Sequence, residues 1–311
     1  MTLSKLAKLC NVSVSTASKA FSGSPDINEE TRKMIFAVAR EHNCFNEFFS
    51  ARYPMPVVAV FCPEFASGYY SQYLSCLEKH FNEKNIKMSV SITEFSKANL
   101  ESLLEYYSCY VKVSGIILMG QSPIAIKSLP AVEMISSQKF LLAIDEAVEA
   151  FKAKGHKRFG YIGEPLCEGK LKCIKDALEK HGLSLDDDFI INDGERMEAG
   201  GYKAAKKLLE KEEKPTALFF GYDQMAIGAM RAFSENGMRI PEDISICSFD
   251  DIPECGFLTP TLSSIGVDFE KASLLSSELL IKMMDEKATG VVEFGSEARF
   301  IERESIGRVK N

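Results

Sequence analysis

The sequence predicts an α/β protein in which a three-helix head precedes a two-lobed core built on parallel sheets. Within the first 46 residues, apolar side chains recur at helical spacing, and each such segment is preceded by a residue that favours the start of a helix. From Pro56 onward, short apolar runs alternate with amphipathic segments, as is typical of parallel strands that helices connect. A chain of 311 residues is long enough for two or three domains. We therefore divide it into a head (1–46), a linker (47–55) and a core (56–311).

The composition indicates a cytoplasmic protein without a membrane span, a metal site or a cofactor. Hydrophobic residues make up 46% and charged residues 26%, which is ordinary for a soluble globular protein. The N-terminus lacks the apolar core of a signal peptide, and no run reaches the roughly 18 apolar residues of a membrane helix. The nine cysteines are scattered without a C-x-x-C pair, and the four histidines lie far apart, which favours reduced thiols over disulfides or zinc.

The charge of the chain is unevenly distributed. The whole sequence has a net charge of −7, yet residues 1–52 hold seven basic and five acidic side chains. The remaining residues hold 30 basic and 39 acidic side chains. A mildly basic head on an acidic body fits a nucleic-acid-binding module whose other domain is kept away from phosphates.

Capping patterns in the head predict a helix-turn-helix followed by a third helix. The expected first helix spans 2–10, and Asn11 tolerates the left-handed conformation that turns the chain out of it. The expected second helix spans 14–20. The caps of the three helices are Thr2, Ser13 and Asn28. Two short helices joined by such a tight turn are typical of DNA-binding heads.

The second helix exposes small and polar side chains that suit the major groove. Its hydroxyls can bind phosphates, and Lys19 can reach the edge of a guanine. The alternative is a solvated helix that merely starts with serines. The candidate DNA contacts are Ser13, Val14, Ser15, Thr16, Ser18 and Lys19.

The head resembles that of the lactose-repressor (LacI/GalR) family. The residues that match the family pattern are Thr2, Leu6, Ala7, Val12, Ser13, Thr16, Ser18, Ile27, Thr31 and Arg32. Asn11 stands where the family has a turn glycine, and Lys19 where it has an arginine. The resemblance implies that Val14, Ser15 and Lys19 read bases.

The linker departs from this family. Family members place a hinge leucine between two base pairs in the minor groove, and that position is Tyr53 here. Tyr53 is therefore a candidate DNA contact, with an ordinary linker residue as the alternative. Glu47, which would bring a negative charge towards phosphate, and Pro54, which ends a helix early, favour the alternative.

The core is expected to form two lobes. The first would comprise about 56–137 and 266–290, and the second about 138–265 and 291–307. The expected elements of the first are strand 57–63, helix 70–85, strand 87–92, helix 97–112, strand 113–120 and strand 129–134. Those of the second are helix 143–154, strand 158–163, helix 168–181, strand 189–192, helix 198–210, strand 217–221, helix 224–236 and strand 245–249. Two such lobes leave a cleft at the carboxyl ends of their strands, where ligands of α/β proteins bind.

The core also resembles that of the lactose-repressor family, most clearly over 215–251. The resemblance implies a periplasmic-binding-protein-like fold and a small effector, a sugar or sugar derivative, in the cleft. Asp250 matches an aspartate that binds sugar hydroxyls, Lys170 stands at a ligand-clamping arginine, and Tyr222 replaces an asparagine. A shorter loop brings Ser136 to Phe140 where the family has an Asp-Asn pair.

Two further residues complete the predicted ligand set. Tyr69 and Tyr70 follow the first strand and can stack on a ring. The alternatives are a core role for Tyr222 and a solvated helix position for Lys170.

We interpret the chain as a ligand-controlled transcription regulator, specifically a repressor, that binds double-stranded operator DNA as a homodimer. Helices near 70–85 and 224–236 are the candidates for the dimer surface. An enzyme would need more than the carboxylates Asp223, Asp250 and Asp251, and adjacent Asp250 and Asp251 would face opposite sides of a strand. A free solute-binding protein would lack the head.

Overall fold

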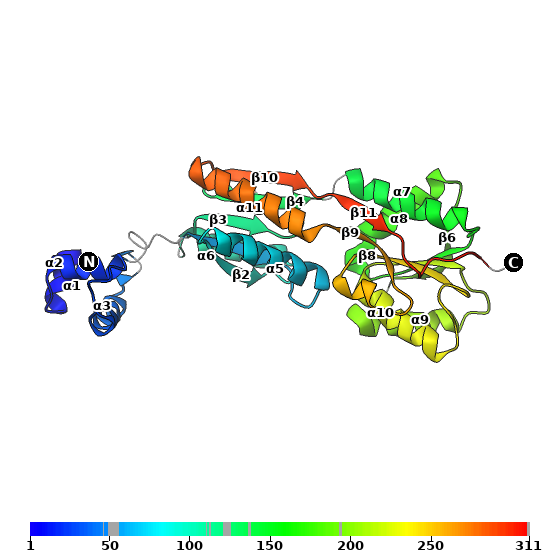
Figure 1. Cartoon of the computed structure of the whole chain (residues 1–311), viewed down its shortest axis with the longest axis horizontal. Coiled ribbons are helices and arrows are strands. Elements are labelled where there is room, and N and C mark those ends of the chain that lie inside the picture. Colours follow the sequence, from blue (N-terminus) through cyan, green and yellow to red (C-terminus); the bar gives the residue numbers. More distant parts are fainter. Residues whose placement is uncertain are drawn as a thin grey trace.

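The computed structural model describes residues 1–45, 47–48, 56–109, 111, 113–120, 126–135, 138–192 and 195–309. The head lies apart from the core, and the core is elongated, with one lobe nearer the head and one beyond it (Figure 1). Tyr53 and most of the predicted hinge lie outside the described residues.

The head contains the three predicted helices, α1 (Leu3–Leu9), α2 (Val14–Phe21) and α3 (Glu29–Glu41). The predicted caps are confirmed, because the side chains of Thr2, Ser13 and Asn28 each accept a hydrogen bond from a backbone N–H in the first helical turn. Asn11 has a φ of 50°, so the chain does turn through the left-handed region between α1 and α2. The helices pack around a small apolar core that includes Leu6, Phe21, Ile35 and Cys44.

The amino-terminal lobe is a parallel sheet with the strand order β10-β4-β3-β1-β2. Its strands are β1 (Val57–Cys62), β2 (Lys87–Ile92), β3 (Gly115–Leu118), β4 (Pro130–Ile135) and β10 (Gly290–Gly295). Its helices are α5 (Gly68–Glu83), α6 (Lys97–Cys109) and α11 (Phe269–Asp285). Buried side chains of β1 and β3 face α5 and α11 on one side of the sheet and α6 on the other.

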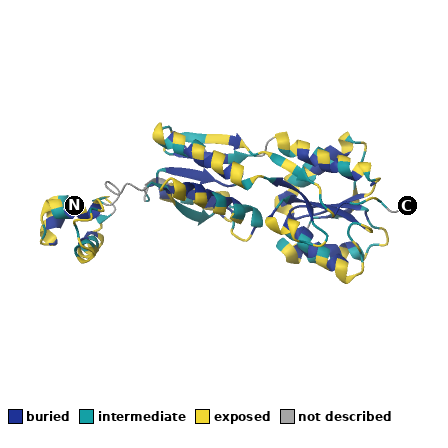
Figure 2. Cartoon of the chain, viewed as in Figure 1, coloured by how far each residue is buried: buried dark blue, intermediate teal, exposed yellow. Residues whose placement is uncertain are grey.

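The carboxyl-terminal lobe has the strand order β11-β9-β8-β7-β5-β6, parallel except for β11. Its strands are β5 (Phe159–Ile162), β6 (Leu185–Ile191), β7 (Ala217–Phe220), β8 (Ser245–Asp250), β9 (Ser263–Val267) and β11 (Ala298–Ile301). Its helices are α7 (Gln138–Ala153), η1 (Pro165–Cys167), α8 (Glu168–Lys180), α9 (Met197–Leu209), α10 (Asp223–Glu235) and η2 (Pro253–Gly256). In both lobes the central strands are buried, the edge strands are partly exposed, and the outer helix faces are exposed (Figure 2).

The structure corrects three details of the sequence prediction. Residues 291–295, which we assigned to the second lobe, form most of β10 and pair with β4 in the first. Helix α7 begins at Gln138 rather than 143, so Gln138 to Phe140 belong to a helix, while 136–137 lie outside the described residues. Strand β6 begins at Leu185 rather than 189.

Within the described ranges, no helix is long and apolar enough to cross a bilayer.

Candidate functional site

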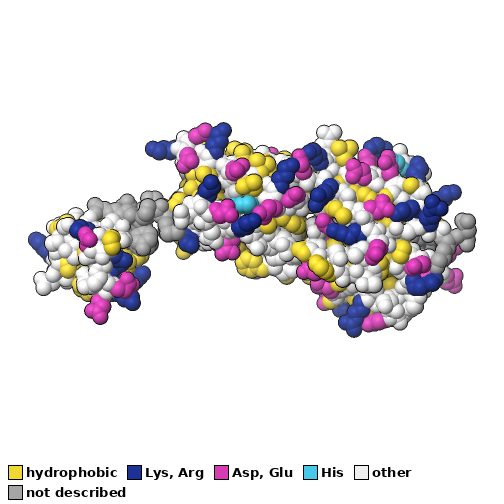
Figure 3. Space-filling model, viewed as in Figure 1, with side chains coloured by type: hydrophobic (Ala, Val, Ile, Leu, Met, Phe, Trp, Pro, Cys, Tyr) yellow, Lys and Arg dark blue, Asp and Glu magenta, His cyan; other side chains and the backbone are white. Residues whose placement is uncertain are grey.

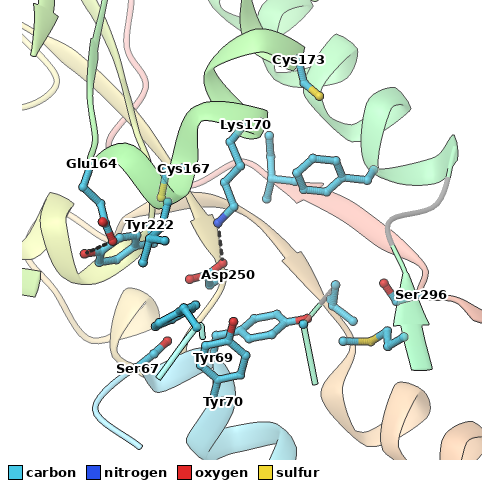
Figure 4. Close-up of a pocket in the computed structure, with 18 of the residues that line it drawn as sticks. Ser67, Tyr69, Tyr70, Glu164, Cys167, Lys170, Cys173, Tyr222, Asp250 and Ser296 are labelled. Atoms are coloured by element: carbon cyan, nitrogen blue, oxygen red, sulfur yellow. Dashed lines mark hydrogen bonds and ion pairs between the residues drawn. The ribbon is translucent and has the colours of Figure 1, made fainter. Parts of the chain in front are cut away.

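A cavity of 760 Å³ lies between the two lobes of the core. Its amino-terminal wall comes from residues after β1, β2 and β3 and at the end of β4, and its carboxyl-terminal wall from residues after β5, β6 and β7 and from Asp250 at the end of β8. All five predicted ligand residues line this one cavity. They are Tyr69, Tyr70, Lys170, Tyr222 and Asp250 (Figure 4).

Asp250 ends β8 with a φ of 103°, a conformation that turns the chain sharply at the edge of the cavity. Its carboxylate is 3.0 Å from the Nζ atom of Lys170, which also donates to the carbonyl of Gly221 at 2.9 Å. Only 27% of the Lys170 side chain is exposed, so it forms part of the cavity wall and not a solvated helix face. Burial is the largest single effect and lowers the pKa of Lys170, yet the neighbouring acidic groups, with Asp250 first among them, together raise it.

Tyr222 has two roles in the structure. Its ring is buried in the apolar core of the carboxyl-terminal lobe, as the alternative interpretation required, and it also borders the cavity. Its hydroxyl accepts the N–H of Met197 at 2.9 Å and donates to Glu164 at 3.4 Å. Burial raises the pKa of Tyr222 to about 12, so the phenol stays protonated at neutral pH.

Tyr69 and Tyr70 open α5 and form an aromatic part of the opposite wall. Their rings meet edge to face with centroids 5.2 Å apart. The ring of Tyr69 also packs against Phe269, and that of Tyr70 against Phe95. These contacts hold both rings in place at the cavity surface.

The sequence prediction missed three charged residues of the cavity, which are Glu64, Glu164 and Arg196. Arg196 donates from both Nη atoms to Glu64, at 2.7 and 2.8 Å, and from Nε to Glu164 at 2.7 Å. A signal was present, since Glu64 and Glu164 each stand two residues after the first strand of their lobe's βαβ series. In each lobe such a position lies at the carboxyl end of the parallel sheet, where the cleft is expected.

The other two carboxylates considered for catalysis lie outside the cavity. Asp223 is buried and accepts the hydroxyl groups of Ser248 and Ser264 and the N–H of Ile252. Burial and the nearby charge of Asp250 raise the pKa of Asp223 to about 7. Asp251 is paired with Arg303 at 2.7 Å. The aspartates 250 and 251 therefore have different partners, and Asp251 lies beyond the end of β8 rather than on the opposite face of the strand.

In the head, α2 presents Ser13, Val14, Ser15 and Lys19 at the surface, while Thr16 and Ser18 are half-buried. Besides capping the helix, the hydroxyl of Ser13 is 2.8 Å from that of Thr16. The Nζ atom of Lys19 is 2.7 Å from Asp26, in the turn that precedes α3. On the visible face of the core both signs of charge are intermixed, without a large basic patch (Figure 3).

Two family models match the chain. The model described as "Bacterial regulatory proteins, lacI family" matches residues 2–44, which include the three capped helices. The model described as "Periplasmic binding protein-like domain" matches residues 148–306, about half of the chain. The chain belongs to the lacI family of bacterial regulatory proteins. The predicted helix-turn-helix and the two-lobed α/β core are the two parts of this family's architecture.

Similar proteins named as transcriptional repressors support the same assignment. The lacI-family chain is 29% identical to the probable HTH-type transcriptional repressor ExuR of Bacillus subtilis (strain 168), with 99% of each protein covered. It is 25% identical to the ribose operon repressor of Haemophilus influenzae, again with 99% of each covered. The chain is thus a DNA-binding transcriptional repressor, and these relatives are regulators rather than enzymes.

Solved structures with this fold include two with bound small molecules. A lac repressor dimer bound to operator and the anti-inducer ONPF matches with a TM-score of 0.73 at 20% identity, over 98% of each chain. A complex of the transcriptional regulator CelR with cellobiose matches with a TM-score of 0.67 at 20% identity, over 98% of this chain and 99% of that one. At this level of identity the likeness shows the fold.

Proposed function

We propose that this lacI-family repressor binds a sugar or sugar derivative in the cavity between its lobes, and that the bound effector controls its affinity for operator DNA. The observation that carries the proposal is the convergence of five predicted residues, from four separate segments of the chain, on one interlobe cavity. A cavity of 760 Å³ is within the usual range for small-molecule sites.

The chemistry of the walls suits a sugar. The Asp250 carboxylate has acceptor capacity beyond its bond to Lys170 and can accept vicinal hydroxyl groups. Tyr69 and Tyr70 supply flat apolar surface for the C–H face of a pyranose or furanose ring. Cellobiose, which is bound in the CelR complex, belongs to this class, and the Haemophilus influenzae relative is named for the ribose operon. A sugar that contacts both walls would change the angle between the lobes and hence the spacing of the heads.

In the head, we propose that Val14, Ser15 and Lys19 read bases and that Ser13, Thr16 and Ser18 bind phosphates. Exposure of the first three residues on α2 supports the base-reading role. One head offers few contacts, so we further propose a homodimer that reads a pseudo-palindrome, with α5 and α10 at the subunit interface. Sedimentation equilibrium of the full-length protein tests this, and a single-chain mass at micromolar concentration would contradict it.

Substitution of Asp250 tests the effector site, and the adjacent Asp251 provides a matched control. Neutral sugars, nucleosides and sugar phosphates are screened for compounds that raise the melting temperature. A ligand at 100 times its Kd stabilises the folded state by about 2.7 kcal/mol. We expect Asp250→Asn to lose this stabilisation and Asp251→Asn, which changes a carboxylate paired with Arg303, to keep it. Equal stabilisation of both variants, or a screen without any active compound, would refute the proposal.

A further inference from the structure

An ionic cluster joins the two lobes at the wall of the cavity. Glu64 follows β1 in the amino-terminal lobe, whereas Glu164 follows β5 and Arg196 directly precedes α9 in the carboxyl-terminal lobe. The two Nη atoms of Arg196 bind both oxygens of Glu64, and its Nε atom binds Glu164. One guanidinium thus binds one carboxylate across the cleft and one carboxylate on its own side.

The geometry of this cluster is that of a strong interaction. The bond to Glu64 is bidentate, and all three N···O distances lie between 2.7 and 2.8 Å. The side chains of Glu164 and Glu64 are 4% and 16% exposed, so water screens the charges much less than at a free surface. The two hydrogen bonds to Glu64, and after them the one to Glu164, raise the pKa of Arg196.

Arg196 makes a second contact across the cleft. Its guanidinium carbon lies 5.0 Å from the ring centre of Phe95, which follows β2 in the amino-terminal lobe. A planar cation over an aromatic face is attracted to it and also shields the ring from water. Arginine is suited to this position because a lysine could neither form the two-pronged bond to Glu64 nor stack on Phe95.

A separate interlobe contact reports whether the cleft is closed. Gln224 of α10 accepts the N–H of Gly68 at 3.0 Å and donates to the carbonyl of Ala66 at 3.3 Å. Gly68 is the first residue of α5, so its N–H has no acceptor within its own helix. Protection of this N–H from solvent exchange therefore depends on the approach of the opposite lobe.

We propose that Arg196 is a positioning residue of the effector site: by binding Glu64 and Glu164 at once, it fixes the distance between the two walls of the cleft. Neither lobe needs the bond between Arg196 and Glu64 for its own folding, because the partners belong to different sheets. The bond instead stabilises the arrangement in which Tyr69 and Tyr70 face Asp250 across the cavity. The proposal builds on the proposed effector site, yet the lobe closure it describes is a property of the ligand-free protein.

Hydrogen–deuterium exchange of the full-length protein, without ligand or DNA, tests this proposal. We expect Glu64→Gln and Arg196→Gln to speed exchange of the Gly68 amide by at least about tenfold. Loss of one charge-assisted hydrogen bond corresponds to a change of about this size. Amides of β7, inside one lobe, are expected to exchange as in the wild type. Small-angle X-ray scattering should show the same two variants to be more extended.

The matched control is Glu164→Gln, which removes the other carboxylate from the same guanidinium but breaks no bond between lobes. We expect it to affect the Gly68 amide less than Glu64→Gln does, and Arg196→Lys to fall between wild type and Arg196→Gln. Unchanged Gly68 exchange in Glu64→Gln and Arg196→Gln would overturn the proposal. Equal effects of Glu64→Gln and Glu164→Gln would overturn it too, since Arg196 would then only stabilise its own lobe. Neither result would bear on whether Asp250 binds a sugar.

Discussion

At the scale of single residues, Lys19 occupies the position where a base-reading side chain of α2 is expected, and it is paired before any DNA arrives. Its ammonium group lies 2.7 Å from Asp26, and the two side chains are 48% and 63% exposed. Exposed ion pairs contribute little because solvent and salt screen them. The phosphates and base edges of an operator can therefore replace Asp26 as the partner of Lys19.

Replacing Lys19 should change specificity more than overall affinity. For Lys19→Ala we expect the discrimination between the correct and a substituted base pair to fall by about 1–3 kcal/mol at one position of each half-site. Lys33→Ala is the control, since it removes the same charge from an exposed position on α3. The measurement is fluorescence anisotropy on an operator selected from random DNA, on point-substituted versions of it, and on random duplexes. Equal losses on cognate and random DNA for Lys19→Ala would contradict base reading.

Residues of the cavity were predictable to different degrees. Asp250, Lys170, Tyr222 and the two tyrosines of α5 were found because each stands at a recognisable place after a strand or within a motif. Arg196 was not, since an arginine before a helix looks like an ordinary surface residue. Its partner Glu64 is 132 positions away in the sequence, and only the folded topology brings the two together.

At the scale of elements, α9 and α10 pack so closely that their backbones nearly touch. A Cβ atom on Gly228 of α10 would lie 1.9 Å from the carbonyl oxygen of Glu198 in α9. A Cβ atom on Gly201 of α9 would lie 1.8 Å from the carbonyl oxygen of Met225 in α10. Glycine is thus required at both positions for close helix packing and not for an unusual φ.

Two glycine-to-alanine variants should therefore have opposite effects. We expect Gly228→Ala to destabilise the protein by about 1–3 kcal/mol, because backbone atoms have to move to admit the methyl group. A Cβ on Gly169, in the first turn of α8, meets nothing within 4 Å, so Gly169→Ala should stabilise by up to about 1 kcal/mol through helix propensity. Urea unfolding of both variants provides the measurement. Equal shifts of the two midpoints would refute the packing argument.

Most element positions followed from the sequence, and the differences have physical causes. Buried strands such as β1 and β7 are short, almost wholly apolar runs, which is the pattern typical of a strand covered on both faces. Strand β6 lies at an edge of its sheet, and its exposed residues Asp186 to Asp188 do not show the buried-strand pattern. Residues 291–295 were assigned to the wrong lobe, without a strand being predicted there, because local pattern does not reveal which sheet a segment joins.

At the scale of the whole molecule, neither lobe is a continuous stretch of chain. Among the described elements the chain passes between lobes after β4, after β9 and after β10. Its last described segment then returns along the carboxyl-terminal lobe, where Val309 donates to the carbonyl of Lys154 and Ser305 to that of Ile246. Segments distant in sequence thus stabilise each other, and attachment of this last segment contributes to the stability of the lobe.

His156 is central to that attachment and makes it sensitive to pH. Its Nε2 atom donates to the carbonyl of Gly307 at 2.9 Å, and its Nδ1 atom lies 3.1 Å from the hydroxyl oxygen of Thr216, which also lies 3.4 Å from the carbonyl oxygen of Arg158. A neutral ring protonated at Nε2 alone can make both contacts. Burial, with a smaller effect from the charge of Lys154, lowers the pKa of His156, although the bond to Gly307 acts in the opposite direction. The folded state therefore binds fewer protons at this site than the unfolded state does near the ordinary histidine pKa.

This difference fixes the direction of a pH dependence. The stability that neutral His156 provides should be fully present above about pH 6.5, and it should be lost as the pH falls from there towards the lowered pKa of the folded state. We expect His156→Gln to be less stable than the wild type at pH 7.5 and the gap between them to narrow at pH 5.5, since glutamine does not titrate. Urea unfolding at several pH values gives the comparison, with His42→Gln, an exposed histidine at the end of α3, as control. A gap that widens on acidification would show that His156 is charged in the folded protein, and the attachment of the last segment would then need another explanation.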